Sequence, residues 1–223
     1  NLTEEGGPKI CLVQCRPMQT TGTVEPVEIP AEVEVRRVLF KSKGHTMGGG
    51  ISRRLDRVIY VRPSVYCRAP LNRRYEIARL IGRLNRATSE RGEVTTMLMG
   101  PGRWGTTTPS LGVPVSFAEI NNTNVLVEIA YEGGNLMPEL SFGTHFFHDL
   151  VENDIFYVAL FPQEAGVIFN EDLLRALPNQ LSEVLPDYGR HGDCVGLYDV
   201  SGLRLRIFAD VASQGVLCLA EGE

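Results

Sequence analysis

The stretch VTTMLMGPGRWG, residues 94–105, joins an apolar run to a glycine-rich loop. Residues 94–99 have the length and composition of a buried strand. The loop at 100–105 follows at the carboxyl end of this strand, which is where open α/β sheets bind ligands. The stretch therefore predicts an α/β fold and marks the loop as a candidate site.

Four residues of this loop are candidate ligand-binding residues. Gly100 and Gly102 allow backbone N–H groups to approach an anion closely. Arg103 carries a planar guanidinium that suits phosphate or carboxylate. Trp104, the only tryptophan of the chain, has a ring that stacks on a base or covers an apolar group. The alternative interpretation is a rigid turn whose tryptophan fills the core and whose arginine pairs with a nearby acid.

A second candidate site lies in SFGTHFFHDL, residues 141–150. Thr144 can cap a helix expected at 144–153, whose first turn offers free N–H groups and a positive dipole end to an anion. His145 and His148 are three residues apart and share one face of that helix. A metal site would need further ligands that the sequence does not show, so none is predicted. The segment is either an anion or substrate site or a structural capped helix.

Composition narrows the class of protein. The chain has 223 residues, is 43% hydrophobic and carries a formal net charge of −5. A negative charge argues against a general nucleic-acid binder. No apolar run approaches the roughly 18 to 20 residues that span a bilayer, and there is no basic-then-apolar leader, so a cytoplasmic protein without membrane contact is expected. The five cysteines are widely spread without a C-x-x-C pair, which predicts reduced thiols.

The rest of the chain predicts a mixed sheet with flanking helices. Residues 57–61 have the pattern of a strand, and 72–87 have the periodicity of an amphipathic helix with arginines on its outer face. Ser201 and Gly202 are expected to form the tight turn of a C-terminal antiparallel hairpin. Further strands are expected at 33–40, 125–130, 155–161, 194–200, 203–209 and 215–219, and a further helix at 170–185.

Proline and glycine mark the expected domain organisation. Residues 17–32 are rich in proline and predict an extended linker. The glycine-rich stretch at 41–50 lacks the residue order of a P-loop and predicts a flexible hairpin or crossover loop. We therefore expect the terminal strand of a separate domain at 1–20, a linker with the glycine-rich loop and an edge strand at 21–56, and an α/β domain at 57–223.

The segment LVQCRPMQ, residues 12–19, reads as a short strand ended by Pro17, with Gln14 and Arg16 on one face. Taken alone, it is an edge strand with two polar side chains in water. It resembles the Gln-x-Arg-Pro strand that ends the ATP-grasp region of phosphoenolpyruvate synthase and pyruvate phosphate dikinase. The resemblance implies that Gln14 and Arg16 bind nucleotide, that ATP and Mg²⁺ are cofactors of the parent protein, and that the rest of its ATP-grasp region precedes this sequence.

A longer resemblance runs over residues 100–162, through GPGRWG, LGVPVSFAEI, GTHFFHDL and IFYVALFP. These motifs are similar to a segment of large bacterial proteins that contain a phosphoenolpyruvate/pyruvate-binding dikinase region. The dikinases also carry a phosphorylated histidine after the ATP-grasp region, where His45 stands here. Its residue order differs, because His45 precedes the glycines, so the sequence assigns it no phosphocarrier role.

Both resemblances imply the C-terminal part of a phosphoenolpyruvate synthase-like, ATP-dependent phosphotransferase. Such a part would bind a phosphorylated or carboxylated small molecule, would have the missing ATP-grasp region as its partner, and would not be catalytic alone. The alternative is a regulatory or protein-interaction module that docks onto the nucleotide-binding domain. An exposed apolar face around Phe142, Phe146 and Phe147, with Trp104 buried, would favour that alternative.

Overall fold

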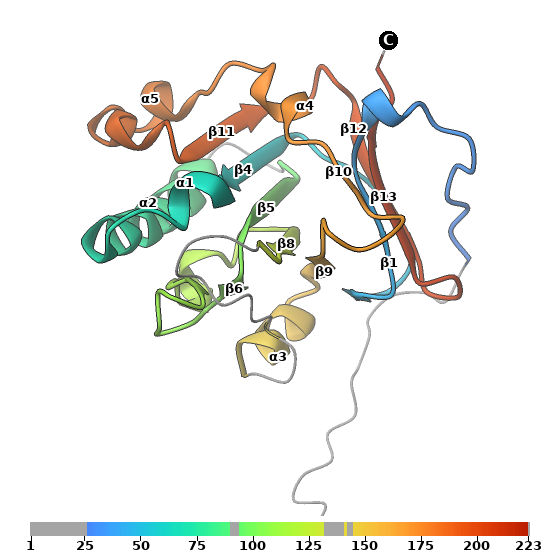
Figure 1. Cartoon of the computed structure of the whole chain (residues 1–223), viewed down its shortest axis with the longest axis horizontal. Coiled ribbons are helices and arrows are strands. Elements are labelled where there is room, and N and C mark those ends of the chain that lie inside the picture. Colours follow the sequence, from blue (N-terminus) through green and yellow to red (C-terminus); the bar gives the residue numbers. More distant parts are fainter. Residues whose placement is uncertain (1–25, 90–93, 132–140, 142–144, 223) are drawn as a thin grey trace, which may run out of the picture.

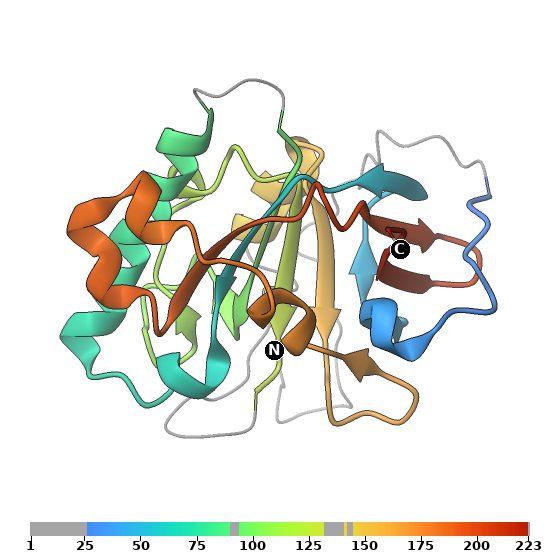
Figure 2. The ribbon, with the colours of Figure 1, turned by 90° about the horizontal axis from the view of Figure 1, so that it is seen from above.

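The computed structural model describes residues 26–89, 94–131, 141 and 145–222. The fold is α/β and has three layers, with helices on one side, a mixed sheet in the middle and an antiparallel sheet on the other side (Figures 1 and 2). The expected α/β class, with a mixed sheet and flanking helices, is therefore confirmed.

The middle layer is a six-stranded sheet in the described part of the chain, with the order β11-β4-β5-β8-β9-β2. Its four central strands are parallel, and the two edge strands are antiparallel to their neighbours. The carboxyl ends of the central strands therefore meet at one edge of the sheet. The strands are β2 (Thr46–Met47), β4 (Arg57–Val61), β5 (Thr96–Pro101), β8 (Val125–Ile129), β9 (Phe156–Leu160) and β11 (Val195–Asp199).

The outer layer is an antiparallel sheet, which has five strands in the described residues and the order β10-β1-β13-β12-β3. Its members are β1 (Val38–Lys43), β3 (Ile51–Arg54), β10 (Ile168–Phe169), β12 (Leu205–Asp210) and β13 (Gly215–Ala220). A short parallel pair, β6 (Arg103–Trp104) with β7 (Gly112–Val113), lies apart from both sheets. The helical layer contains α1 (Pro63–Tyr66), α2 (Leu71–Ser89), α3 (His145–Glu152) and α5 (Leu181–Val184).

The central strands are mostly apolar because both of their faces are covered. In β4, Ile59 and Val61 face the helices, while Val58 and Tyr60 face the antiparallel sheet. Alternate side chains of a strand point to opposite faces, so each face contributes to a different core. This double burial explains why residues 57–61 and 94–99 are recognisable as strands from the sequence.

Helix α2 matches the helix expected at 72–87 to within two residues at each end. Its apolar residues Ile77, Leu80, Ile81 and Leu84 are fully buried against the mixed sheet. Full burial of each such side chain contributes roughly 1.5–3 kcal/mol. Of the arginines expected on the opposite face, Arg79, Arg83 and Arg86 are exposed, but Arg74 is buried and donates to the backbone carbonyls of Cys67, Ala69 and Pro109.

The helix expected at 170–185 is wrong. The segment forms two short helices, α4 (Asp172–Arg175) and α5, and a 3₁₀ helix, η3 (Pro186–His191), continues the chain. Pro178 cannot continue a helix, because it lacks an N–H group and its ring clashes with the preceding turn. The next residue, Asn179, fixes the break: its amide donates to the carbonyls of Gly192 and Val195, and its oxygen accepts from the N–H groups of Leu181 and Leu197.

The turn at Ser201 and Gly202 does not close a hairpin. It leads from β11 in the mixed sheet to β12 in the antiparallel sheet, so the two strands do not pair. The C-terminal antiparallel hairpin exists one connection later, between β12 and β13, with Asp210 opposite Gly215. The expected hairpin is therefore present, but it is built from the last two strands.

Residues on both sides of the expected boundary at 56 and 57 belong to one fold. The expected strand at 33–40 begins only at Val38, after a 3₁₀ turn η1 (Val35–Arg37), and pairs with β13. The glycine-rich stretch is a crossover: it leaves β1, passes through β2 on the mixed sheet and returns to the antiparallel sheet at β3. Residues 38–54 thus contribute β1 and β3 to the antiparallel sheet and β2 to the mixed sheet. None of the described helices is long and apolar enough to cross a membrane.

Candidate functional site

The candidate loop lies at the carboxyl edge of the parallel strands, as the sequence predicts. After β5, Gly102 adopts a left-handed conformation with φ of +61° and donates its N–H to the carbonyl of Ile129 at 2.8 Å. Arg103 then donates its backbone N–H to the carbonyl of Leu111 at 2.9 Å. Because these N–H groups already have acceptors, the backbone of Gly102 and Arg103 does not offer donors to a ligand. The side chain of Arg103 is partly exposed.

A buried carboxylate fixes the position of this turn. Glu128 is fully buried on β8, directly opposite Gly100 of β5. One carboxylate oxygen accepts the backbone N–H of Trp104 at 2.8 Å and the hydroxyl of Ser141 at 2.5 Å. The other accepts the backbone N–H of Ser141 at 2.8 Å and the hydroxyl of Tyr157 at 2.7 Å. The carboxylate thus ties β8, β9, the turn and residue 141 together.

Burial decides the protonation behaviour of this network. Removing the carboxylate from water raises the pKa of Glu128, and the hydrogen bonds from Ser141, Trp104 and Tyr157 oppose this effect without cancelling it. Burial, with Glu128 as a neighbour, also raises the pKa of Tyr157, so its hydroxyl stays protonated and can donate. The network therefore has a structural role: it holds the turn that carries Arg103 in one conformation.

Trp104 fills the core. Its side chain is fully buried among the residues between the mixed sheet and the helices, and its indole Nε1 has no acceptor among the described residues. Gly100 makes room for it, because a Cβ at Gly100 would lie 2.7 Å from Cζ2 of the indole. These positions match the alternative interpretation, in which the glycine and the tryptophan serve packing. Neither residue is accessible to a ligand in this conformation.

The two segments that the sequence marks as candidate sites are neighbours in the fold. A Cβ at Gly105 would lie 2.1 Å from Cδ2 of Phe146, which is the second residue of α3. The hydroxyl of Ser141 also lies 3.2 Å from the carbonyl oxygen of Trp104. The first turn of α3 therefore packs directly against the turn that carries Arg103.

The structure describes some of the other predicted site residues and not the rest. His145 is the first residue of α3, and His148 lies one turn further with its side chain partly buried. Thr144 and Phe142 lie outside the described residues, as do Gln14 and Arg16. Phe146 and Phe147 are buried, so two of the three aromatic residues that would indicate an exposed docking face do not form one.

His45 lies beside Phe161 and Glu164. Its ring centroid lies 4.7 Å from that of Phe161, and its Nε2 lies 3.7 Å from the carboxylate of Glu164. Its backbone carbonyl accepts the N–H of Ala159 on β9. Among the described residues, no three His, Cys, Asp or Glu side chains come together as a metal-binding group.

Sequence reasoning missed Glu128, Ser141 and Tyr157. A signal for the first was present: Glu128 is the one charged residue in the apolar run VLVEIA at 125–130. A charged residue inside a strand buried on both faces needs several donors, because an unpaired buried charge is very unfavourable. The identity of those donors depends on the fold and has no local signal.

No family model matches the chain, and no curated protein or solved structure shows significant similarity to it.

Proposed function

We propose that this chain binds a phosphorylated or carboxylated small molecule at the carboxyl edge of its parallel sheet. The observation that carries the proposal is the direct packing of the Arg103 turn against the first turn of α3. The contact joins two segments that each carry a feature favouring an anion: the guanidinium of Arg103 in one and the amino end of a helix in the other.

Positive charge and a rigid backbone both favour anion binding at this place. An arginine side chain binds the two oxygens of a carboxylate or phosphate with two parallel hydrogen bonds. The N-terminal turn of α3 adds the partial positive charge of a helix end, about half an elementary charge. The Glu128 network holds the backbone beside Arg103 in place, so less conformational freedom is lost when the ligand binds. His148, which is partly buried on α3, is a further candidate for contact with the ligand's polar groups.

We also propose that the chain is the C-terminal part of a phosphoenolpyruvate synthase-like, ATP-dependent phosphotransferase in the cytoplasm. The two sequence resemblances support this assignment. In such a protein Gln14 and Arg16 would contact ATP and Mg²⁺, and the phosphoryl transfer would take place in the nucleotide-binding region. The present chain would hold a carboxylated or phosphorylated partner of that reaction and would not transfer phosphate by itself.

Isothermal titration calorimetry with phosphoenolpyruvate, pyruvate, inorganic phosphate and ATP tests the ligand-binding proposal. We expect phosphoenolpyruvate or pyruvate to bind and Arg103→Ala to weaken the affinity by about 10-fold to 100-fold, because a hydrogen-bonded ion pair contributes roughly 1.5–3 kcal/mol. Arg36→Ala is the matched control, since Arg36 is exposed and pairs with Glu34 two residues away. Equal affinity in the wild type and the Arg103 variant, or no binding of any of these ligands, would contradict the proposal.

A further inference from the structure

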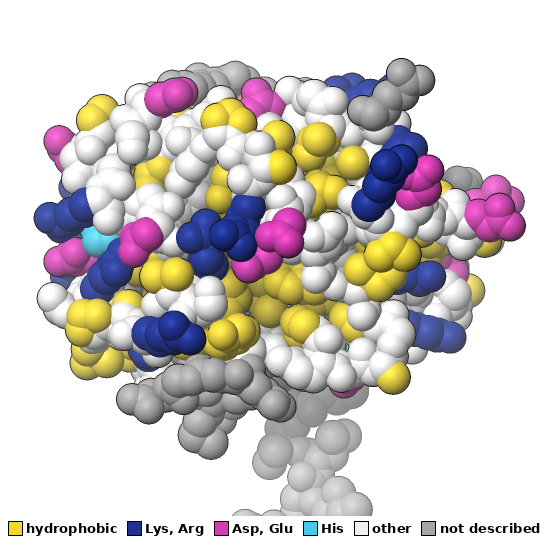
Figure 3. Space-filling model, turned by 45° about the horizontal axis from the view of Figure 1, so that its top comes forward, with side chains coloured by type: hydrophobic (Ala, Val, Ile, Leu, Met, Phe, Trp, Pro, Cys, Tyr) yellow, Lys and Arg dark blue, Asp and Glu magenta, His cyan; other side chains and the backbone are white. Residues whose placement is uncertain are grey.

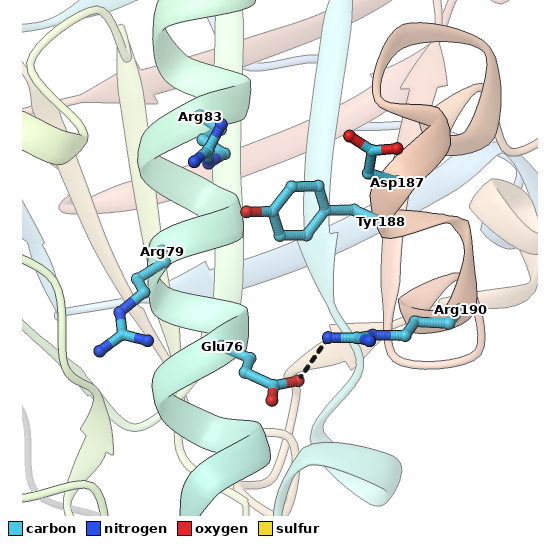
Figure 4. A pocket seen from close by; sticks show the side chains of 6 residues that line it. All are labelled: Glu76, Arg79, Arg83, Asp187, Tyr188 and Arg190. Atoms are coloured by element: carbon cyan, nitrogen blue, oxygen red, sulfur yellow. Dashed lines mark hydrogen bonds and ion pairs between the residues drawn. The ribbon is translucent and has the colours of Figure 1, made fainter.

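A pocket lies on the helical layer, between α2 and η3. Its described lining consists of Glu76, Arg79 and Arg83 from α2 and Asp187, Tyr188 and Arg190 from η3, and we call it the arginine pocket. Its volume is about 380 Å³. Figure 4 shows Tyr188 reaching from η3 toward α2, with Arg83 near its ring and Arg190 directed at Glu76. The pocket shares no residue with the Arg103 turn.

The charges in the arginine pocket do not cancel. Glu76 is neutralised by Arg190, whose Nη2 lies 3.2 Å from its carboxylate oxygen. Arg79 has no hydrogen bond or ion pair with any described residue, and Arg83 contacts the ring of Tyr188. Asp187, also exposed, is the remaining carboxylate of the lining. The rest of the lining thus contains two guanidinium groups and one carboxylate, on a protein whose overall charge is negative. Figure 4 shows the side chain of Arg79 directed away from η3, so it has to change its rotamer to reach a ligand beside Tyr188.

The aromatic contact distinguishes Arg83 from an ordinary solvated arginine. Its Cζ lies 5.5 Å from the centroid of the Tyr188 ring. A guanidinium stacked on a ring keeps its N–H donors at its edges, where an anion can still accept them. The stacking also restricts the side chain, so less entropy is lost when it binds a ligand.

The wall that carries Tyr188 is itself held in place. Arg73, one turn before Glu76 on α2, pairs with Asp193 just after η3. The carboxylate of Glu76 also lies 3.4 Å from Nε2 of the buried His191, and Arg190 donates its Nε–H to that same nitrogen at 3.2 Å. These contacts connect α2 to η3 at one end of the pocket. Arg79 and Arg83, one helical turn apart, remain available at the other.

We propose that the arginine pocket binds a phosphate monoester whose organic part is planar and apolar. Arg79 and Arg83 donate to the phosphoryl oxygens, and the exposed edge of Tyr188 contacts the organic group. A phosphate monoester carries about −1.5 to −2 charges at pH 7 and has three acceptor oxygens, so it suits two arginine forks better than a carboxylate does. Figure 3 shows that arginine or lysine side chains gather with acidic ones on the helical side of the molecule, which agrees with a local rather than a general attraction for anions.

Titration of the full chain with phenyl phosphate, inorganic phosphate and benzoate tests this proposal. We expect phenyl phosphate to bind more tightly than the other two compounds. Replacing both arginines in Arg79→Ala/Arg83→Ala should weaken its binding by at least about tenfold, and Tyr188→Leu should abolish the preference for phenyl phosphate over inorganic phosphate. All three side chains lie on the surface of the helical layer, and circular dichroism checks that each variant is folded.

Two controls separate this site from the other basic surfaces. Arg68→Ala removes an exposed arginine outside the pocket and should leave the affinity unchanged. A double variant, Arg79→Lys/Arg83→Lys, should recover only part of the affinity, because lysine keeps the charge but lacks the fork. Equal binding of phenyl phosphate by the wild type and the alanine double variant, or equal losses with Arg68→Ala, would overturn the proposal.

Discussion

Replacing Glu128 tests whether the buried network holds the Arg103 turn. In Glu128→Leu, the backbone N–H groups of Trp104 and Ser141 lose their acceptor inside the core. Each buried donor left without a partner costs about 1–3 kcal/mol, so the two together cost roughly 2–6 kcal/mol of unfolding free energy. A domain of this size is stable by about 5–15 kcal/mol, so this loss is a large part of the total.

The tryptophan of this chain provides the assay. Trp104 is the single tryptophan and is fully buried next to the network, so its fluorescence reports unfolding of this region directly. At about 2–4 °C per kcal/mol for a chain of this length, we expect Glu128→Leu to lower the melting temperature by roughly 4–24 °C. Tyr157→Phe removes one hydroxyl donor and leaves the carboxylate with its other partners, so it should cost about 0.5–1.5 kcal/mol.

Glu128→Gln gives a graded comparison. An amide can accept the N–H of Trp104 with its oxygen, but its NH₂ group then faces the N–H of Ser141. We expect a loss between those of Tyr157→Phe and Glu128→Leu. Ordinary surface substitutions change the free energy of unfolding by no more than about 0.5 kcal/mol. If the unfolding free energy of Glu128→Leu lies that close to the wild-type value, the network does not hold the turn.

Three further predictions concern packing, pH and reactivity. Gly105→Ala should cost more stability in urea unfolding than Gly166→Ala, because both glycines have positive φ but only a Cβ at Gly105 would collide with Phe146; equal costs would refute the close contact. Burial and the neighbouring arginines lower the pKa of His191 below its ordinary 6.5, so the unfolded chain binds its proton at a higher pH and stability should fall as pH drops through that value; this fall should be smaller in His191→Gln, and an unchanged pH profile would contradict the assignment. The thiol of Cys218 is fully buried with a raised pKa, so a thiol reagent should modify it only on unfolding, and rapid modification of the native protein at this residue, found by mass spectrometry, would contradict its burial.

The elements that the sequence predicts well are those whose pattern is set locally. Residues 58–61 are a continuous apolar run, and 125–130 are apolar except for Glu128, because both faces of the sheet are covered. Helix α2 has a single apolar stripe because only one of its faces is covered. In each case burial imposes a period on the residues themselves. These strands and this helix fix the α/β class.

The elements that are predicted wrongly from the sequence depend on partners that are distant in the chain. Residues 170–185 have helical periodicity, but Pro178 interrupts it and Asn179 bonds to residues 13 to 18 positions later. The turn at Ser201 and Gly202 has good hairpin chemistry, yet β11 pairs with β4 and β12 pairs with β13. Turn residues permit a hairpin without deciding which strand becomes the neighbour.

The side-chain contacts of the candidate site could not be predicted from the sequence either, because they too join residues that are distant in the chain. Glycines that permit a close ligand equally permit close packing, and the structure uses Gly100 to accommodate the indole of Trp104. The sequence places Arg103 correctly at a strand end, since that placement follows from the order of elements. It contains no information on which buried group stabilises the turn, because Glu128, Ser141 and Tyr157 meet only in the folded protein.

Amide chemical-shift mapping shows whether an anion binds between the Arg103 turn and the amino end of α3. The measurement is a titration with phosphoenolpyruvate in the Arg79→Ala/Arg83→Ala background, which removes the arginine pocket. We expect saturable shifts that gather at Gly102, Arg103 and Phe146, and their loss when Arg103→Ala is added. Shifts that gather elsewhere, or that persist without the guanidinium of Arg103, would contradict it.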